Sequence, residues 1–275
     1  MNLSTATLVL LTALCTATAC AAPPPPRVAP GTDPAATWLE LDGARMLVTT
    51  TRAARGRSHR GLPLLIVLPW SRSTPAQALA EVGYADIEVP ARIVAIQGFE
   101  PDRDGFSWWR RTRPAPADPD RDYELVSLLS DRAERLSSLV DAVQHHVGSP
   151  SVTVVTGISQ GGDLSIALGI LHPTAISAAL PIASRFPEPM WPSLTTTASA
   201  PPPIDAFQGA ADPVAPFAAL QRSVAALRHR GYPVVLHRYD DLAHDVSPAL
   251  AADVRACAAL RLRGLRDPCP RRASP

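Results

Sequence analysis

Ser159 lies in a segment whose residue types and spacing suit nucleophilic catalysis. Positions 157–162 read Gly-Ile-Ser-Gln-Gly-Gly. The apolar run at 152–155 predicts a buried strand before the serine, and the run at 163–171 predicts a helix after it. A serine between glycines at such a strand-to-helix turn presents its hydroxyl clear of the sheet, at the N-terminus of the helix. The pattern therefore predicts a serine nucleophile; the competing interpretation is a glycine-rich turn without chemistry.

A serine nucleophile needs a general base, and histidine is the side chain that most often takes its proton. In enzymes built on this turn the chain order is serine, carboxylate, histidine, which leaves His229, His237 and His244. His229 falls at a solvated helix end, and His237 falls inside a predicted strand. His244 follows the predicted strand 233–239 in a loop, where α/β sheets build their sites, so we predict His244 as the base.

The carboxylate that orients the base should follow the preceding predicted strand, 202–209. Asp212 lies there, and it would fix the histidine tautomer and stabilise the imidazolium. The alternative role for Asp212 is to cap the helix that follows. The other carboxylates lie inside the strand or too close to the histidine in the sequence: Asp205, Asp240, Asp241 and Asp245.

Acyl transfer also needs two N–H donors for the developing oxyanion. The backbone N–H of Gln160 is one of them. The second should come from Pro69-Trp70-Ser71, the loop after the apolar strand predicted at 62–68. Because proline has no N–H, the donor is Trp70 or Ser71.

These loops need a sheet to position them. A hairpin signal at Asp42-Gly43 is followed by apolar strands that alternate with helices from 62 to 262. Such alternation predicts an α/β fold with a doubly wound, mostly parallel sheet. The 275 residues suffice for a single domain of this kind, which we expect at 37–275.

Composition narrows the chemistry. The net charge is +1, which gives no case for nucleic acid as a partner. All 26 residues in the Lys+Arg count are arginine, so neither a Schiff base nor a serine–lysine dyad is available. We expect no metal and no cofactor.

The N-terminus predicts export. A short apolar run at 8–14 precedes Ala17-Thr18-Ala19, a small-residue cleavage site, so 1–19 is expected to be a signal peptide. Positions 17–20 also resemble a bacterial lipoprotein box in which Cys20 is acylated. The proline-rich stretch 20–36 would then act as an extended tether. The alternative is a soluble secreted or periplasmic form.

Cysteine count agrees with export. Cleavage removes Cys15, and acylation would occupy Cys20. Cys257 and Cys269 then remain, and two nearby cysteines in an exported chain predict a disulfide. The alternative is a pair of free thiols.

Three stretches together resemble the phospholipase/carboxylesterase family of α/β-hydrolases, over roughly 62–262. They are 157–162, Gly-Phe-Ser-Trp-Trp at 105–109, and Gln-Gly-Ala-Ala-Asp-Pro-Val-Ala-Pro at 208–216. The resemblance implies Ser159 as nucleophile, Asp212 as acid and His244 as base. It also implies the N–H groups of Ser71 and Gln160 as the oxyanion hole. Two positions depart from the family pattern. Where the family has His-Gly at the oxyanion hole, this chain has Pro69-Trp70, and where the family has a histidine before the glycine of the motif at 208–216, this chain has Gln208.

The leading functional interpretation is an exported serine esterase that acts on carboxylic esters, with thioesters and lysophospholipids as further candidates. We expect Trp70, Trp108 and Trp109 to wall a pocket for small or medium acyl groups; the alternative is that one or both of Trp108 and Trp109 pack in the core. One alternative is a peptidase of the prolyl-oligopeptidase type, for whose additional domain this chain has no room. Another is a non-catalytic binding lipoprotein, which the substitution at Pro69-Trp70 favours and the intact Ser/Asp/His order opposes.

Overall fold

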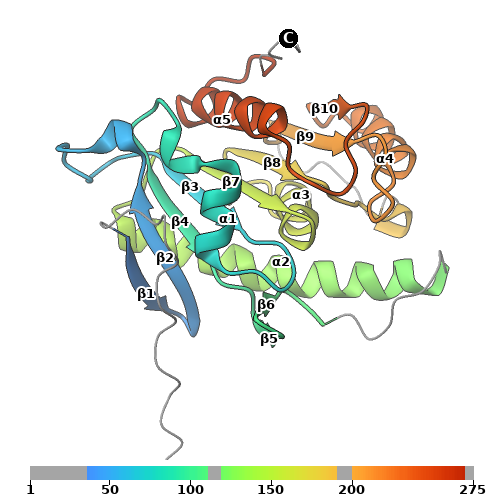
Figure 1. Ribbon diagram of the computed structural model, residues 1–275, viewed down its shortest axis with the longest axis horizontal. Helices are drawn as coiled ribbons and strands as arrows, with labels where there is room; N and C mark the ends of the chain where they lie inside the picture. Colours follow the sequence, from blue (N-terminus) through green and yellow to red (C-terminus); the bar gives the residue numbers. More distant parts are fainter. Residues whose placement is uncertain (1–35, 111–118, 191–199, 270–275) are drawn as a thin grey trace, which may run out of the picture.

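The computed structural model describes residues 36–110, 119–190 and 200–269. Its centre is an eight-stranded sheet in the order β1-β2-β4-β3-β7-β8-β9-β10 (Figure 1). Strand β2 is antiparallel to both neighbours, and all other neighbouring pairs in this sheet are parallel. The strands of the sheet are β1 Thr37–Leu41, β2 Ala44–Thr50, β3 Leu64–Leu68, β4 Arg92–Ile96, β7 Thr153–Ile158, β8 Ala178–Ile182, β9 Ile204–Gly209 and β10 Val234–Tyr239. This confirms the predicted α/β fold with a doubly wound, mostly parallel sheet in one domain.

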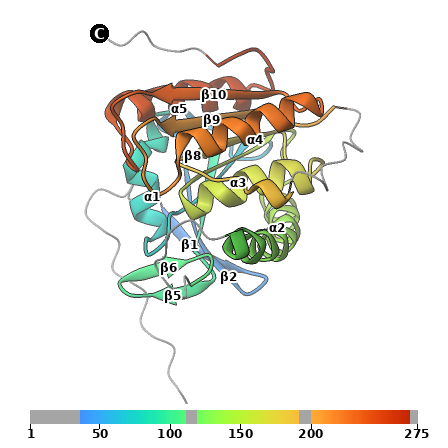
Figure 2. The same ribbon diagram turned by 90° about the vertical axis from the view of Figure 1, so that its right-hand side faces the viewer.

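Helices cover both faces of the sheet (Figures 1 and 2). They are α1 Pro75–Val82, α2 Pro119–Val147, α3 Gln160–Leu171, α4 Phe217–His229 and α5 Pro248–Leu262. Helices α1 and α5 contribute to one apolar core, and α2, α3 and α4 contribute to the core on the opposite face. Strand β3 lies between the two cores and is buried along its whole length. That burial on both faces explains its uninterrupted apolar sequence.

Local sequence signals set the ends of several elements. The hairpin between β1 and β2 turns at Asp42 and Gly43, whose φ angles are 49° and 69°, the conformation that an Asp-Gly turn favours. Helix α1 begins after Thr74, which forms a capping box with Gln77. It ends at Gly83 in the left-handed conformation.

Two predicted segments differ from the structure. The long excursion after β4 contains a second, two-stranded sheet, β5 Glu100–Asp102 and β6 Gly105–Ser107. The helix predicted to follow Asp212 begins only at Phe217, because the N–H groups of Val214 and Ala215 bind Asp212 in a turn before it. The expected signal peptide, the acylated Cys20 and nearly all of the tether lie outside the described residues.

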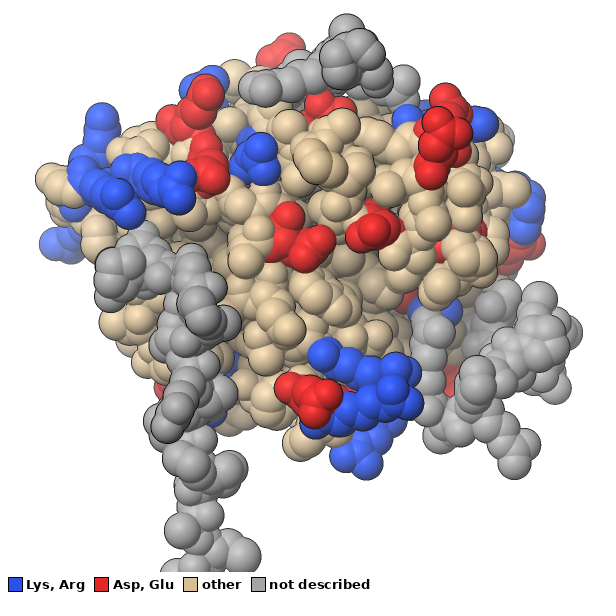
Figure 3. Space-filling model, in the orientation of Figure 1, with Lys and Arg blue, Asp and Glu red and all other residues tan. Residues whose placement is uncertain are grey.

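The C-terminal segment is fastened to the domain by the predicted disulfide. Cys257 in α5 is bonded to Cys269, and both side chains are buried. No helix in the described ranges is long and apolar enough to span a membrane. On the face seen in Figure 3, arginine and acidic side chains are interspersed and broad areas carry neither.

Candidate active site

The nucleophile elbow forms where β7 meets α3. Ser159 occupies the junction with a φ of 54°, a strained value for a residue with a side chain. A Cβ on Gly157 would lie 2.2 Å from the carbonyl oxygen of Gly161, and one on Gly161 would lie 2.1 Å from that of Leu68. Only glycine fits at these two positions. The motif glycines therefore permit the sharp turn and its close packing against the end of β3.

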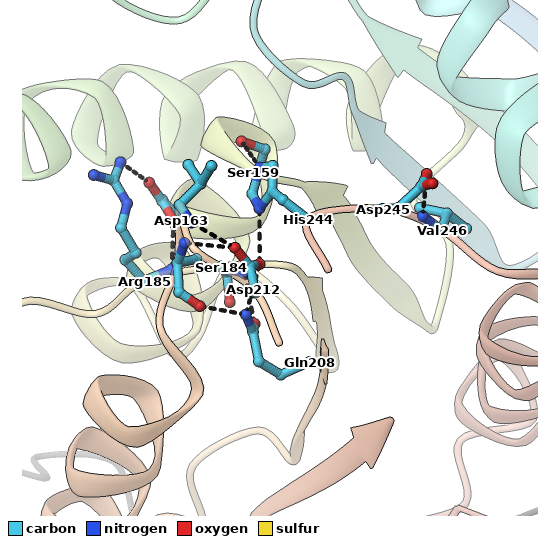
Figure 4. A network of polar contacts seen from close by, with 11 residues as sticks. Ser159, Asp163, Ser184, Arg185, Gln208, Asp212, His244, Asp245 and Val246 are labelled. Atoms are coloured by element: carbon cyan, nitrogen blue, oxygen red, sulfur yellow. Dashed lines mark hydrogen bonds and ion pairs between the residues drawn. The ribbon is translucent and has the colours of Figure 1, made fainter. Parts of the chain in front are cut away.

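The structure brings together all three residues that the sequence predicts as a triad. Nε2 of His244 lies 3.0 Å from Oγ of Ser159, and Nδ1 of His244 lies 2.8 Å from Oδ2 of Asp212 (Figure 4). Asp212 follows β9 and His244 follows β10, so both come from loops at the carboxyl edge of the sheet. The arrangement is a continuous hydrogen-bonded line from carboxylate to hydroxyl.

Gly209 allows the loop that carries His244 to pack closely on the chain that leads to Asp212. Periodicity in the sequence does not reveal this role. A Cβ at Gly209 would lie 2.2 Å from the carbonyl oxygen of Leu242, in the loop that leads to His244. The N–H of Ala211 also donates to that carbonyl, at 3.1 Å. The loop that carries the histidine therefore rests directly on the backbone that leads to Asp212.

Asp212 is buried and accepts four hydrogen bonds. Oδ1 accepts from the N–H groups of Val214 and Ala215, both at 2.8 Å, and Oδ2 accepts from His244 and from the side chain of Gln208 at 2.9 Å. Burial alone would raise the pKa of Asp212. The hydrogen bonds from His244, Ala215 and Val214, together with the charge of His244, outweigh burial and lower the pKa of this carboxyl. Asp212 therefore serves both roles considered from the sequence, since it orients the histidine and also binds the turn before α4.

The loop after β3 offers the expected oxyanion donors. The N–H of Arg72 donates to Oγ of Ser107, and that of Ser73 donates to the carbonyl of Phe106. The N–H groups of Trp70 and Ser71 have no hydrogen-bond partner in the part of the chain that the structure describes, and neither does that of Gln160. Trp70 and Ser71 thus remain the available donors, beside the elbow that packs on Leu68.

The segment 105–109 holds this loop in place, a role that its sequence pattern does not predict. Phe106 and Ser73 form an antiparallel bridge, and a Cβ on Gly105 would lie 2.5 Å from the carbonyl oxygen of Arg72. The side chain of Gln160 accepts from the N–H of Trp108 at 3.0 Å and donates to the carbonyl of Trp109 at 3.1 Å. The hairpin β5–β6 and the elbow are therefore braced against each other.

The tryptophans are placed differently from the prediction. Trp108 is fully buried and donates through Nε1 to the carbonyl of Pro69 at 2.8 Å, and Trp109 is only 3% exposed. Their burial corrects the prediction that both wall a substrate pocket, since they pack in the core beneath the excursion. Trp70 is half-buried against the core that contains α1 and α5, and it is the one of the three tryptophans that is not buried.

The other histidine candidates lie away from the triad. His237 is buried within β10, stacked on Phe207, and His229 ends α4. One group within the described ranges has the spacing of a metal site: Asp205, Cys257 and Cys269. The two sulfurs are bonded to each other, and the carboxylate is bound by Arg261, so this group is not built to ligate a metal.

The chain is similar in sequence to one known protein family. The family model for phospholipase/carboxylesterase matches residues 116–257, just over half of the chain. No protein of curated function matches the chain in sequence.

Similar solved structures include esterase PE8, with 16% identity and a TM-score of 0.66 over 78% of this chain and 97% of that one. A carboxylesterase from Mesorhizobium loti has 19% identity and a TM-score of 0.64, over 82% and 99% of the two chains. The Bacillus cereus carboxylesterase has 15% identity and a TM-score of 0.61, over 80% and 95%. At these identities the likeness shows the fold alone. The family match, which covers the serine motif and Asp212 with His244, shows that the chain belongs to the phospholipase/carboxylesterase family and is an ester-hydrolysing serine hydrolase.

Proposed function

We propose that the chain hydrolyses carboxylic esters through an acyl-enzyme formed on Ser159. The observation that carries the proposal is the hydrogen-bonded line from Asp212 through His244 to Ser159, with distances of 2.8 and 3.0 Å. Both distances are within the reach that proton transfer requires. The strained elbow supports the same assignment, because such strain persists where the surrounding structure and the function require it.

Each residue has one task in the proposed reaction. His244 takes the proton of Ser159 as the hydroxyl attacks the ester carbonyl, and Asp212 stabilises the imidazolium that forms. The N–H groups of Gln160 and of Ser71 or Trp70 bind the oxyanion of the tetrahedral intermediate. His244 then returns the proton to the leaving alcohol, and a water molecule releases the acid by the same steps in reverse order.

For the substrate we propose esters of small or medium acyl chains, with thioesters and lysophospholipids as the wider range. The family, named for both phospholipases and carboxylesterases, supports that range. Trp70 stands at the loop expected to supply an oxyanion donor, so its indole would limit the space for the acyl group. A panel of nitrophenyl esters of rising acyl length measures this limit directly.

A burst experiment tests the proposal itself. Rapid mixing with nitrophenyl acetate should give a burst of nitrophenol equal to the enzyme concentration, followed by slower turnover, if an acyl-enzyme accumulates. Trapping and mass spectrometry should locate the acyl group on Ser159. An enzyme that neither acylates nor turns over any ester in the panel would instead support the binding-protein interpretation.

We further propose that the protein is exported and anchored through an acylated Cys20. The residues at 17–20 and the proline-rich stretch after them motivate this proposal. Labelled palmitate should be incorporated into the wild-type protein and not into Cys20→Ser. A soluble mature form with an unmodified Cys20 would contradict the anchor and leave export possible.

A further inference from the structure

We propose that Gln208 is a positioning residue for the triad, which holds Asp212 in line with His244 through a neutral amide. The inference rests on the proposed esterase mechanism and adds a fourth side chain to it. Gln208 lies at the end of β9 and is fully buried. The proposal follows from three hydrogen bonds of its amide and from what those bonds connect.

The amide of Gln208 is satisfied on both sides. Nε2 donates to Oδ2 of Asp212 at 2.9 Å and to the carbonyl of Ala215 at 2.6 Å. Oε1 accepts from the N–H of Ser184 at 3.1 Å. These partners fix the amide orientation, because a flipped amide would set its oxygen against a carboxylate and a carbonyl, and its NH₂ against an N–H donor. The donor side of Gln208 therefore faces the triad acid.

The same oxygen of Asp212 receives both side-chain donors. Oδ2 accepts from His244 and from Gln208, while Oδ1 is bound only by backbone N–H groups. Gln208 thus holds the oxygen that has to stay directed at Nδ1 of His244. Without that donor, the His244 bond would be the only hydrogen bond from the described residues that orients Oδ2.

Gln208 also closes a ring of contacts that returns to the nucleophile (Figure 4). Its partner Ser184 precedes Arg185, whose N–H and guanidinium both bind the carboxylate of Asp163 at 2.6 Å. Asp163 is buried in the first turn of α3, the helix whose N-cap residue is Ser159. The acid is therefore tied to the nucleophile by two routes, one through His244 and one through Gln208 and the loop after β8.

The chemical type of this link matters. An amide donates the same hydrogen bonds at every working pH, whereas the histidine that the family carries at this position can gain a proton. In this chain Gln208 therefore supports Asp212 without adding a second ionisation beside the catalytic pair. A carboxylate at position 208 would place a negative charge against Asp212 and favour the imidazolium form of His244.

The test compares Gln208→Leu, Gln208→Glu and Gln208→His with the wild-type protein. We expect Gln208→Leu to lower kcat about 10- to 100-fold with KM nearly unchanged, as for loss of a hydrogen bond to a charged group. Gln208→Glu should move the acid limb of the pH profile of kcat/KM upward by about one pH unit. Gln208→His restores a donor, so it should recover most of the kcat lost in Gln208→Leu.

Gln144→Leu is the matched control. Gln144 is also an amide that bridges elements, and it is half-buried, since Nε2 donates to Oγ1 of Thr153 and to the carbonyl of Ala175. It lies near the C-terminal end of α2, and its partner Thr153 is the first residue of β7, whereas Ser159 follows the other end of that strand. Its replacement should lower thermal stability and leave kcat and the acid limb where they are.

Two results would overturn the proposal. One is a kcat within twofold of wild type in Gln208→Leu. The other is an acid limb in Gln208→Glu that coincides with that of wild type, which would reduce Gln208 to a packing role. If Gln208→Leu does not fold, the pH profiles of the Glu and His variants decide the question.

A measurement that needs no ester hydrolysis tests the role of Gln208 independently of the proposed function. The titration of the His244 ring, followed by NMR in wild type and Gln208→Glu, should move to higher pH in the variant whether or not esters are the substrate. An unmoved titration contradicts the positioning role even in an active esterase. A moved titration in a protein that hydrolyses no ester supports the role and rejects the esterase.

Discussion

The last two strands of the sheet and the loops that follow them carry two histidine–aspartate pairs with the same sequence spacing and different surroundings. Asp205 and Asp212 are seven positions apart, and so are His237 and His244. Asp205 and His237 lie inside β9 and β10, while Asp212 and His244 lie in the loops that follow. The two pairs therefore share their residue types and the strands they belong to or follow, and they differ in their position along the chain.

The loop pair is joined and the strand pair is not. His244 and Asp212 are 2.8 Å apart, whereas Nε2 of His237 is 3.7 Å from Oδ1 of Asp205, too far for a hydrogen bond. Neither ring nitrogen of His237 has a hydrogen-bond partner within the described ranges. Oδ2 of Asp205 instead accepts from Nε and Nη2 of Arg261, at 2.9 and 2.8 Å. A permanent cation, and not the histidine, compensates the buried carboxylate.

This difference explains why we propose the loop pair, and not the strand pair, for catalysis. The loop pair has an imidazole with a carboxylate on one nitrogen and a hydroxyl on the other, as proton transfer requires. The strand pair has neither a nucleophile nor access to a substrate, since both side chains are buried. Asp205 and Arg261 form a structural ion pair that joins the sheet to α5.

The largest loss of kcat is expected when the catalytic line proposed through His244 is broken. His244→Ala should reduce kcat about 10⁴- to 10⁶-fold, because the base is lost, and Ser159→Ala should match it. The double variant should be no worse than either single one, since the residues act as a unit. Steady-state kinetics with nitrophenyl acetate measure all three, and circular dichroism checks the fold. A loss of less than tenfold in His244→Ala would reject it as the base.

Replacing each aspartate by asparagine should distinguish the roles of the two carboxylates. Asp212→Asn should lower kcat about 10⁴-fold, because an amide no longer fixes the histidine tautomer. Asp205→Asn should leave kcat within a few-fold and lower stability instead. A large kcat loss in Asp205→Asn with an intact fold would show that the strand pair takes part in catalysis.

The stability contributed by Asp212 should depend on pH in a predictable direction. The pKa of Asp212 is lowered in the folded protein, so its contribution to stability is present above the ordinary carboxyl range near 3.9. That contribution is lost as pH falls through the lower, folded value. Urea midpoints measured from pH 6 down to the acid limit should therefore fall less steeply in Asp212→Asn than in wild type.

Much of this arrangement was predictable from the sequence because it depends on periodicity and chain order. Alternating apolar strands and helices placed the sheet, and the position of His244 just past a strand distinguished it from His237. The same reasoning placed Asp212 after β9. Each of these inferences uses a local pattern together with one rule about where parallel strands end.

The rest depends on contacts between distant residues that no local pattern encodes. Arg261 binds Asp205 across 56 positions, and Gln160 binds Trp108 across 52. The tryptophans at 108 and 109 emerge at the correct edge of the sheet, yet they turn inward beneath α2 because their surroundings supply an apolar core. Direction of a side chain in an irregular loop is a tertiary property.

Breaking the ion pair between Arg261 and Asp205 should affect stability alone. Arg261→Met should cost about 3–5 kcal/mol of unfolding free energy, because it leaves a buried carboxylate uncompensated. Arg261 also donates to the carbonyls of Leu265 and Asp267, so part of the loss reflects the C-terminal segment. Adding Asp205→Leu should recover some of the stability, since both charges are then gone. Chemical denaturation of the three variants measures this, with kcat per folded molecule unchanged.

Replacing His237 itself should change stability only slightly and kcat not at all. Its ring is stacked on Phe207 with centroids 4.6 Å apart and planes 8° from parallel, so its surroundings use it as a flat apolar group. His237→Phe keeps that stack and removes two buried nitrogens that have no partner among the described residues. Burying an unpaired polar group costs about 1–3 kcal/mol, so the variant should be as stable as wild type or more stable, after any strain from the larger ring. Its kcat and pH profile should be those of wild type. A loss of stability beyond about 2 kcal/mol would show that the imidazole nitrogens serve the Asp205–Arg261 pair after all, and that the two histidine–aspartate pairs are more alike than their distances indicate.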